Sequence, residues 1–171
     1  FEPNFQEFHS AQESDGCDSF FRGSIGSEPM QELISRYMGT ERFCMEWFDH
    51  QDEVLKLYAA LAEKRRQVYP ICADSPALAF NYGGNVTPEI LGLKRFEEYY
   101  VPHYNEAAEI LHEKGKFIGV HFDANYKLIA EAIAKTKLDY IEAFTPSPDT
   151  DMTLTDARKV WQDKILWINF P

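Results

Sequence analysis

The chain has 171 residues, of which 44% are hydrophobic and 26% are charged, a balance typical of a globular domain. Its formal net charge of −11 argues against nucleic-acid binding, because a phosphate-binding surface needs clustered Lys and Arg. No apolar run approaches the roughly 20 residues that span a bilayer, so we expect no membrane partner. Three isolated cysteines and an N-terminus without a signal-peptide pattern are what we expect of a cytoplasmic protein.

The first part of the chain predicts an extended lead-in, a strand and a helix. Residues 1–16 are polar, with Pro, Ser, Gln and Gly, and favour a loop or extended segment. A strand is predicted over residues 19–25. It leads into a turn in which Ser27 is placed to cap a helix and Pro29 to lie in its first turn. That helix is predicted to end at Gly39, the usual position of a left-handed cap.

The middle of the chain alternates helical and strand patterns. An amphipathic helix is predicted over residues 51–68 and a strand over residues 76–82. The clearest helical periodicity covers residues 93–111, and Pro102 within it should bend or split the helix. The nearly continuous apolar run at residues 117–122 suits a strand that is covered on both faces, as in a parallel sheet.

The same alternation continues to the last residues. We predict a helix over residues 125–135, a strand over 139–144, a helix over 153–161 capped by Thr153, and a strand over 165–170. The resulting order, β-α-β-α-β-α-β-α-β with short connections, predicts an α/β fold with about five parallel strands. The pattern alone leaves two choices, a doubly wound sheet or part of a barrel.

Short motifs follow one another from residue 81 to residue 171. They are Asn85-Val86-Thr87-Pro88, Phe96-Glu97-Glu98-Tyr99-Tyr100-Val101-Pro102-His103-Tyr104, Leu111-His112-Glu113-Lys114-Gly115-Lys116, His121-Phe122-Asp123-Ala124-Asn125, Leu138-Asp139-Tyr140-Ile141-Glu142, Leu154-Thr155-Asp156-Ala157-Arg158 and Ile168-Asn169-Phe170-Pro171. Together they resemble the uroporphyrinogen decarboxylase and corrinoid methyltransferase superfamily, and the likeness extends more loosely to residue 17. The resemblance implies a TIM-type (β/α)₈ barrel with its active site at the carboxyl ends of the strands.

Such a barrel typically has about 250 residues, which is more than this chain provides. The resemblance therefore implies that residues 17–171 are part of one catalytic barrel domain, truncated at both ends. We expect such a fragment to be inactive by itself. We also expect its open sheet edges to favour self-association.

His121 and Asp123 are the first candidates for chemistry. They stand two residues apart at the end of a predicted strand, so both side chains should point to the same side. Imidazole and carboxylate both ligate zinc, which makes the pair a candidate metal site. The methyltransferase branch of the superfamily has His-x-Cys here and holds a zinc ion. The alternative is a hydrogen-bonded histidine, with Asp123 capping the next helix.

Further polar residues stand at the ends of other predicted strands. Glu142 ends the strand that follows His121 and is a candidate for metal binding, substrate binding or general-base catalysis. Asn169 ends the last strand and is a candidate substrate-binding residue. Asn81, Tyr82 and the loop Gly83-Gly84-Asn85 form a third candidate patch for substrate, because glycines let a backbone approach a ligand closely.

Three functions remain open from the sequence. In the first, a corrinoid-linked methyltransferase, zinc at His121 and Asp123 would act on a small-molecule or corrinoid-protein substrate. In the second, a decarboxylase would act on tetrapyrrole acetate groups without a metal, and Tyr37 loosely matches a tyrosine of that branch's substrate cleft. In the third, a non-catalytic barrel would only bind a ligand. The polar residues at the strand ends argue against this third function.

Overall fold

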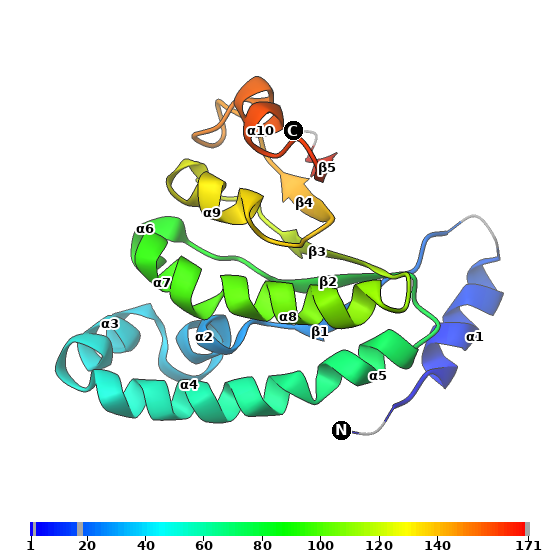
Figure 1. Cartoon of the computed structure of the whole chain (residues 1–171), viewed down its shortest axis with the longest axis horizontal. Coiled ribbons are helices and arrows are strands. Elements are labelled where there is room, and N and C mark those ends of the chain that lie inside the picture. The colour runs from blue at the N-terminus through cyan, green and yellow to red at the C-terminus, as the bar shows by residue number, and fades with distance from the viewer. Residues whose placement is uncertain (2, 17–18, 170–171) are drawn as a thin grey trace.

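The computed structural model of the chain describes residues 1, 3–16 and 19–169. Its centre is a single sheet made of β1 Gly23–Gly26, β2 Ala79–Gly84, β3 Phe117–His121, β4 Tyr140–Phe144 and β5 Ile165–Ile168. The strands lie in the order β1-β2-β3-β4-β5, and all neighbouring pairs are parallel (Figure 1). The predicted α/β fold with about five parallel strands is therefore confirmed.

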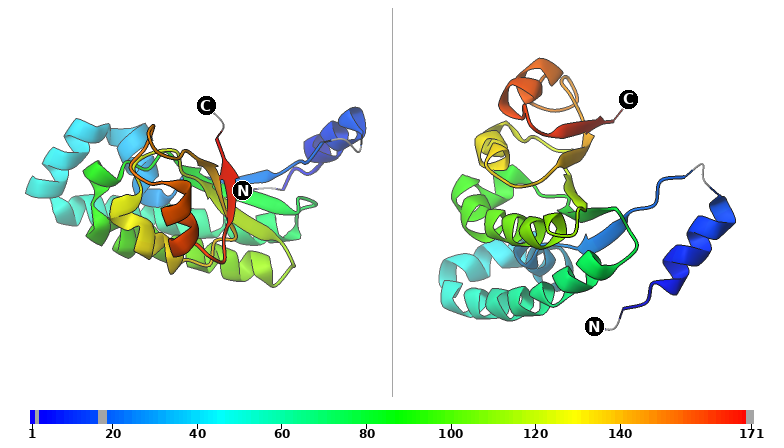
Figure 2. Two further views of the ribbon diagram at one scale, coloured as in Figure 1. Left: turned by 90° about the horizontal axis from the view of Figure 1, so that it is seen from above. Right: turned by 45° about the vertical axis from the view of Figure 1, so that its right-hand side comes forward.

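The strand order bears on the two choices that the sequence left open, a doubly wound sheet and part of a barrel. A doubly wound sheet reverses its strand order at a switch point and carries helices on both faces. In the described part of the chain the order never reverses, and Figure 2 shows α2 to α10 on one face of the sheet. Right-handed crossovers between successive neighbours place every connecting helix on the same face. The arrangement is compatible with part of a (β/α)₈ barrel.

The helices form a layer over this one face, with α1 lying apart from them in Figure 2. The helical elements are α1 Gln6–Asp15, α2 Pro29–Glu32, the π-helix η1 Leu33–Met38, α3 Thr40–Asp49, α4 Gln51–Arg66, α5 Val68–Asp74, α6 Pro88–Leu91, α7 Leu93–Tyr99, α8 Val101–His112, the 3₁₀-helix η2 Lys127–Ile129, α9 Ala130–Ala134 and α10 Leu154–Val160. The predicted strand over residues 165–170 ends at Ile168, and residue 170 lies outside the described residues.

Two of the local predictions are confirmed. Pro102 divides the predicted helix, because α7 ends at Tyr99 and the proline occupies the first turn of α8, where its missing N–H costs no helical hydrogen bond. Thr153 caps α10, and its hydroxyl oxygen accepts a hydrogen bond from the backbone N–H of Asp156 at 3.1 Å.

Other local predictions were wrong. The lead-in predicted as extended over residues 1–16 contains the helix α1, which buries no residue and therefore shows no apolar stripe. Ser27 does not cap α2, because the N-cap position belongs to Glu28, whose extended backbone precedes Pro29. The sequence also failed to predict α3, which buries only Phe43, and the short α5.

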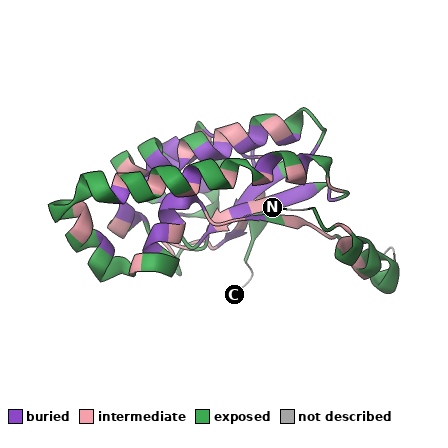
Figure 3. Cartoon of the chain, turned by 90° about the horizontal axis from the view of Figure 1, so that it is seen from below, coloured by how far each residue is buried: buried purple, intermediate pink, exposed green. Residues whose placement is uncertain are grey.

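The hydrophobic core lies between the helical layer and the sheet. Figure 3 shows buried residues on the sides of the helices that face the sheet, whereas α1 is mostly exposed. Trp161 has no exposed surface and donates its indole N–H to the carbonyl oxygen of Ala130 at 2.9 Å. In the described residues, no helix is long and apolar enough to cross a membrane.

The opposite face of the sheet is largely uncovered, unlike the face under the helices. Phe117 is 46% exposed, Ile165 62% and Trp167 51%, although all three lie on strands. A cavity of about 400 Å³ opens on this face, between these residues and Phe20. This face of the sheet is therefore an exposed apolar surface.

Candidate functional site

The uncovered face of the sheet changes from apolar to polar along its strands. Toward the amino ends lie Ala79 on β2 and Phe117 on β3, which line the cavity. Asn81 lies two residues after Ala79 on β2, and His121 lies four residues after Phe117 on β3. Both are on the same face as the cavity, because side chains alternate along a strand. His121 is paired with Glu142 of β4 in the sheet register. A polar cluster therefore occupies the carboxyl ends of the central strands, where ligands bind in parallel α/β folds.

Glu142 is the centre of this polar cluster. One carboxylate oxygen accepts a hydrogen bond from the Arg22 guanidinium at 2.7 Å. The other accepts from the Asn81 amide at 2.7 Å and lies 3.0 Å from Nδ1 of His121. Arg22 also contacts the side-chain oxygen of Asn81 at 3.2 Å. The carboxylate of Glu142 on β4 thus connects β2, β3 and the segment that precedes β1.

These donors set the charge of Glu142. Burial alone would raise the pKa of its carboxyl, but hydrogen bonds from Arg22, His121 and Asn81 outweigh burial and lower the pKa below its usual value. Glu142 is therefore a carboxylate near neutral pH. A carboxylate only accepts hydrogen bonds, so its contact with His121 requires the hydrogen to be on Nδ1.

This assignment leaves Nε2 of His121 as the nitrogen that is free to exchange a proton. Nε2 lies 3.3 Å from a carboxylate oxygen of Asp123, which confirms the prediction that the two side chains lie on the same side. A hydrogen on Nε2 would find an acceptor in the carboxylate of Asp123.

Three more side chains belong to the cluster, and the sequence analysis did not predict them. The hydroxyl of Tyr140 lies 2.7 Å from the backbone oxygen of Phe80 and 2.7 Å from the side-chain oxygen of Asn81, so its single hydrogen is shared between these two acceptors. Burial raises the pKa of Tyr140 above its usual value, so the hydroxyl stays neutral. The guanidinium of Arg22 lies 4.9 Å from the ring centre of Trp167, a cation–π contact.

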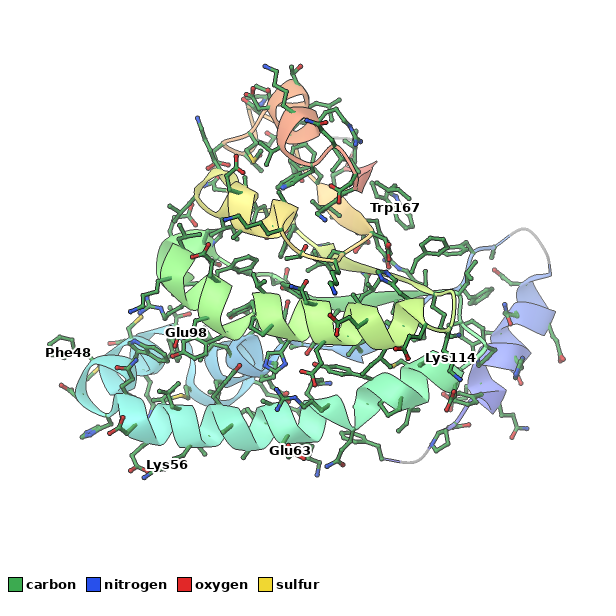
Figure 4. The ribbon with its side chains drawn as sticks, in the orientation of Figure 1. Phe48, Lys56, Glu63, Glu98, Lys114 and Trp167 are labelled. Atoms are coloured by element: carbon green, nitrogen blue, oxygen red, sulfur yellow. The ribbon has the colours of Figure 1, made fainter. Side chains whose placement is uncertain are left out.

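A usable signal for these residues existed in the sequence. Tyr140 precedes Glu142 by two positions on β4, so strand alternation places the two on one face. Trp167 stands two positions before Asn169 in the same way. Figure 4 shows Trp167 projecting from β5 on the side away from the helices. Arg22 precedes β1 and gave no comparable signal.

The remaining predicted site residues do not join this cluster. Tyr82 lies on the opposite face of β2 from Asn81, is fully buried under the helices and shares a 2.7 Å hydrogen bond with Tyr69. Tyr37 is 57% exposed on η1, and Asn85 lines a separate cavity of about 200 Å³. Asn169 follows β5 and donates to the hydroxyl of Thr145 at 3.2 Å.

The His121 and Asp123 pair was tested as a possible zinc site. Two tetrahedral ligands at ordinary zinc distances are separated by about 3.4 Å, close to the observed 3.3 Å between Nε2 and the carboxylate oxygen. The contact of Nδ1 with Glu142 is also the outer contact that metal-bound histidines make. Catalytic zinc, however, takes three protein ligands, and the described residues contain no group of three His, Cys, Asp or Glu side chains placed to hold a metal. The pair fits two ligand positions and lacks a third.

Comparison with known proteins does not name a family. No protein-family model matches the chain, and no curated protein matches it significantly. The functional argument therefore rests on the fold and on the geometry of the polar cluster.

Replacing Glu142 with glutamine should lower the free energy of unfolding at pH 7 by about 1–3 kcal/mol, because Arg22 and His121 lose their charged acceptor. The pKa of Glu142 is lowered on folding, so its stabilising contribution is present above the ordinary value of 4.5 and is lost as the pH falls through the folded-state pKa. Urea unfolding of the wild type and of Glu142→Gln at several pH values measures the difference in their free energies of unfolding. That difference should become smaller in acid.

A surface ion pair provides the matched control. Glu109 contacts Lys137, and both side chains are at least half exposed. Glu109→Gln should change stability by no more than about 1 kcal/mol at pH 7. A Glu142→Gln difference that stays the same from pH 7 to pH 3 contradicts the charge assignment.

Proposed function

We propose that the chain is the catalytic face of a (β/α)₈-barrel enzyme of the uroporphyrinogen decarboxylase and corrinoid methyltransferase superfamily. In this proposal it transfers a proton to or from a small-molecule substrate. The observation that carries the proposal is the histidine–carboxylate pair of His121, the last residue of β3, and Glu142, its partner in the register of the parallel strand β4. Active sites of (β/α)₈ barrels lie at the carboxyl ends of the strands.

In the proposed mechanism, Glu142 fixes the orientation and the tautomer of His121 and stabilises the imidazolium when it forms. Nε2 then gives or takes the substrate proton, and Asp123 holds the ring in its charged state. The neutral hydroxyl of Tyr140 keeps Asn81 in place beside Glu142, and Trp167 offers an exposed apolar ring for a flat substrate. The residues thus combine a proton carrier with an aromatic ring that can hold a substrate.

Decarboxylation is the reaction that uses this arrangement most directly. When an acetate side chain breaks its carbon–carboxylate bond and releases CO₂, the electron pair stays on the remaining carbon, which must then take up a proton. Imidazolium Nε2 of His121 supplies that proton and returns to the neutral form. The tetrapyrrole acetate groups suggested by the sequence resemblance are substrates of this chemical class.

The proposal also accounts for the uncovered face of the sheet. In a barrel this face is the interior, and further βα units would cover Phe117, Ile165 and the free edges of β1 and β5. Interiors of (β/α)₈ barrels are packed with side chains, which explains the apolar character of the cavity. The isolated chain is accordingly expected to lack activity.

A second candidate function is methyl transfer from a corrinoid or another methyl donor. The observation that favours it is the 3.3 Å separation of His121 and Asp123, which suits two ligands of one zinc ion. A bound zinc would activate a thiol as thiolate. This function needs a third ligand beyond those that the described residues supply.

The two functions are separated by assays on the intact protein. Release of CO₂ from uroporphyrinogen tests the first, and methyl transfer from methylcobalamin to a thiol tests the second. Zinc content is measured in parallel for the wild type and Asp123→Ala. Decarboxylation without zinc supports the first function, and thiol methylation with zinc that Asp123→Ala loses supports the second. If neither reaction occurs, both are overturned in favour of a ligand-binding barrel.

A further inference from the structure

Glu28 has an ionisable carboxyl group that the proposed reaction does not use, and its side chain is completely buried. It occupies the N-cap position of α2, yet its side chain makes no capping hydrogen bond. Instead, Tyr104 on α8 donates its hydroxyl to Oε1 of Glu28. Oε2 has no hydrogen-bond partner among the described residues. Burying a carboxyl group in this way is costly, so a role outside its own helix is expected.

The carboxyl group of Glu28 lies directly against the turn that ends β2. A Cβ atom on Gly83 would overlap both carboxyl oxygens, so only glycine fits between the strand end and Glu28. Gly83, Gly84 and Asn85 have φ values of 70°, 139° and 53°, a run of left-handed backbone that needs support from its surroundings.

The other side of the same turn lies against His121. Gly84 is paired with His121 in the sheet, immediately after the register shift that follows Asn81. A Cβ atom on Gly84 would stand 2.8 Å from Cβ of His121 and 3.0 Å from its carbonyl oxygen. Glu28 therefore lies on one side of Gly83 and Gly84, and His121 lies close on the other side, so a displacement of this backbone would change its packing against His121.

We propose that Glu28 is a positioning residue that holds the imidazole of His121 against Glu142 by supporting the Gly83–Gly84 turn. This inference rests on the proposed role of His121 in proton transfer. Burial raises the pKa of Glu28 to about 7, although the hydrogen bond from Tyr104 acts against the rise. The neutral carboxyl group below that pH has nearly the shape and polarity of a glutamine side chain, which provides a conservative variant.

The test follows the imidazole ¹⁵N signals of the chain's five histidines by NMR at pH 6, with His121→Ala used to assign His121. We expect Glu28→Ala to move the His121 signals and leave those of exposed His9 in place. Glu28→Gln should restore the wild-type signals, which a loss of general packing would not predict. In an assay of the active protein, Glu28→Ala should lower kcat about 10- to 100-fold with little change in KM.

Glu32 provides the matched control, because it lies on the same helix and its carboxylate contacts Arg65 at 2.9 Å. Glu32→Ala should leave the His121 signals unchanged. If Glu28→Ala does not fold, Glu28→Asp withdraws the carboxyl by one methylene and should move the same signals. Wild-type His121 signals in a folded Glu28→Ala or Glu28→Asp protein overturn the inference. The NMR result needs no substrate, so it is independent of whether the proposed reaction occurs.

Discussion

Replacing His121 with alanine should lower kcat/KM of the intact enzyme by about 10²- to 10⁴-fold, the usual contribution of a general acid–base residue. The reason is that neither Glu142 nor Tyr140 can supply the proton in place of Nε2. Glu142 is held as a carboxylate by Arg22 and Asn81, and Tyr140 has a pKa raised by burial. Steady-state kinetics over a range of pH values measures the loss.

His9→Ala is the matched control for this variant, because His9 is exposed on α1, and it should leave kcat/KM unchanged. The Glu142→Gln enzyme should keep more activity than His121→Ala, because a glutamine oxygen can still accept the hydrogen bond from Nδ1. Full turnover by a folded His121→Ala protein would show that the proton carrier lies elsewhere.

A second large effect is expected at Gly119, in the middle of β3. A Cβ atom there would overlap the ring of Tyr140, whose hydroxyl lies 2.7 Å from each of its two acceptors. The ring cannot swing aside without losing these contacts. We therefore expect Gly119→Ala to lower the free energy of unfolding by about 1–3 kcal/mol and Gly119→Val by more, as measured by urea unfolding.

A double-mutant cycle identifies the cause of that loss. In a Tyr140→Ala background the ring is gone, so Gly119→Ala should cost much less than in the wild type. An equal cost in both backgrounds contradicts the steric account and points to the backbone of β3 instead. The cycle also reports on function, because a displaced Tyr140 releases Asn81 from its place beside Glu142.

The sequence predicted the parallel sheet well because strand and helix periods differ clearly in its second half. The apolar run at residues 117–122 and the helix divided at Pro102 each leave a strong local pattern. Elements that bury little leave no such pattern. For this reason α1 was read as an extended segment, and α3, with only Phe43 buried, was not predicted.

The polar cluster was predicted in part for a related reason. His121 ends β3, Asp123 follows it, and Asn81 and Glu142 lie on the neighbouring strands β2 and β4, so their proximity follows from parallel pairing. Arg22 reaches Glu142 across 120 positions of the chain, and no local pattern encodes such a contact. Tyr82 does not share a substrate patch with Asn81 as predicted, because residues next to each other on a strand point in opposite directions.

The consecutive order of the strands affects how the chain can fold. Each strand pairs with the strand that precedes it in the sequence, so a completed βα unit is the template for the next one. Loops between successive partners stay short compared with those of a sheet whose order reverses, which lowers the entropy lost on closing them. During synthesis on a ribosome, β1 to β3 and their helices can associate before β5 has emerged. Assembly can thus proceed in one direction along the polypeptide, from its first strand to its last.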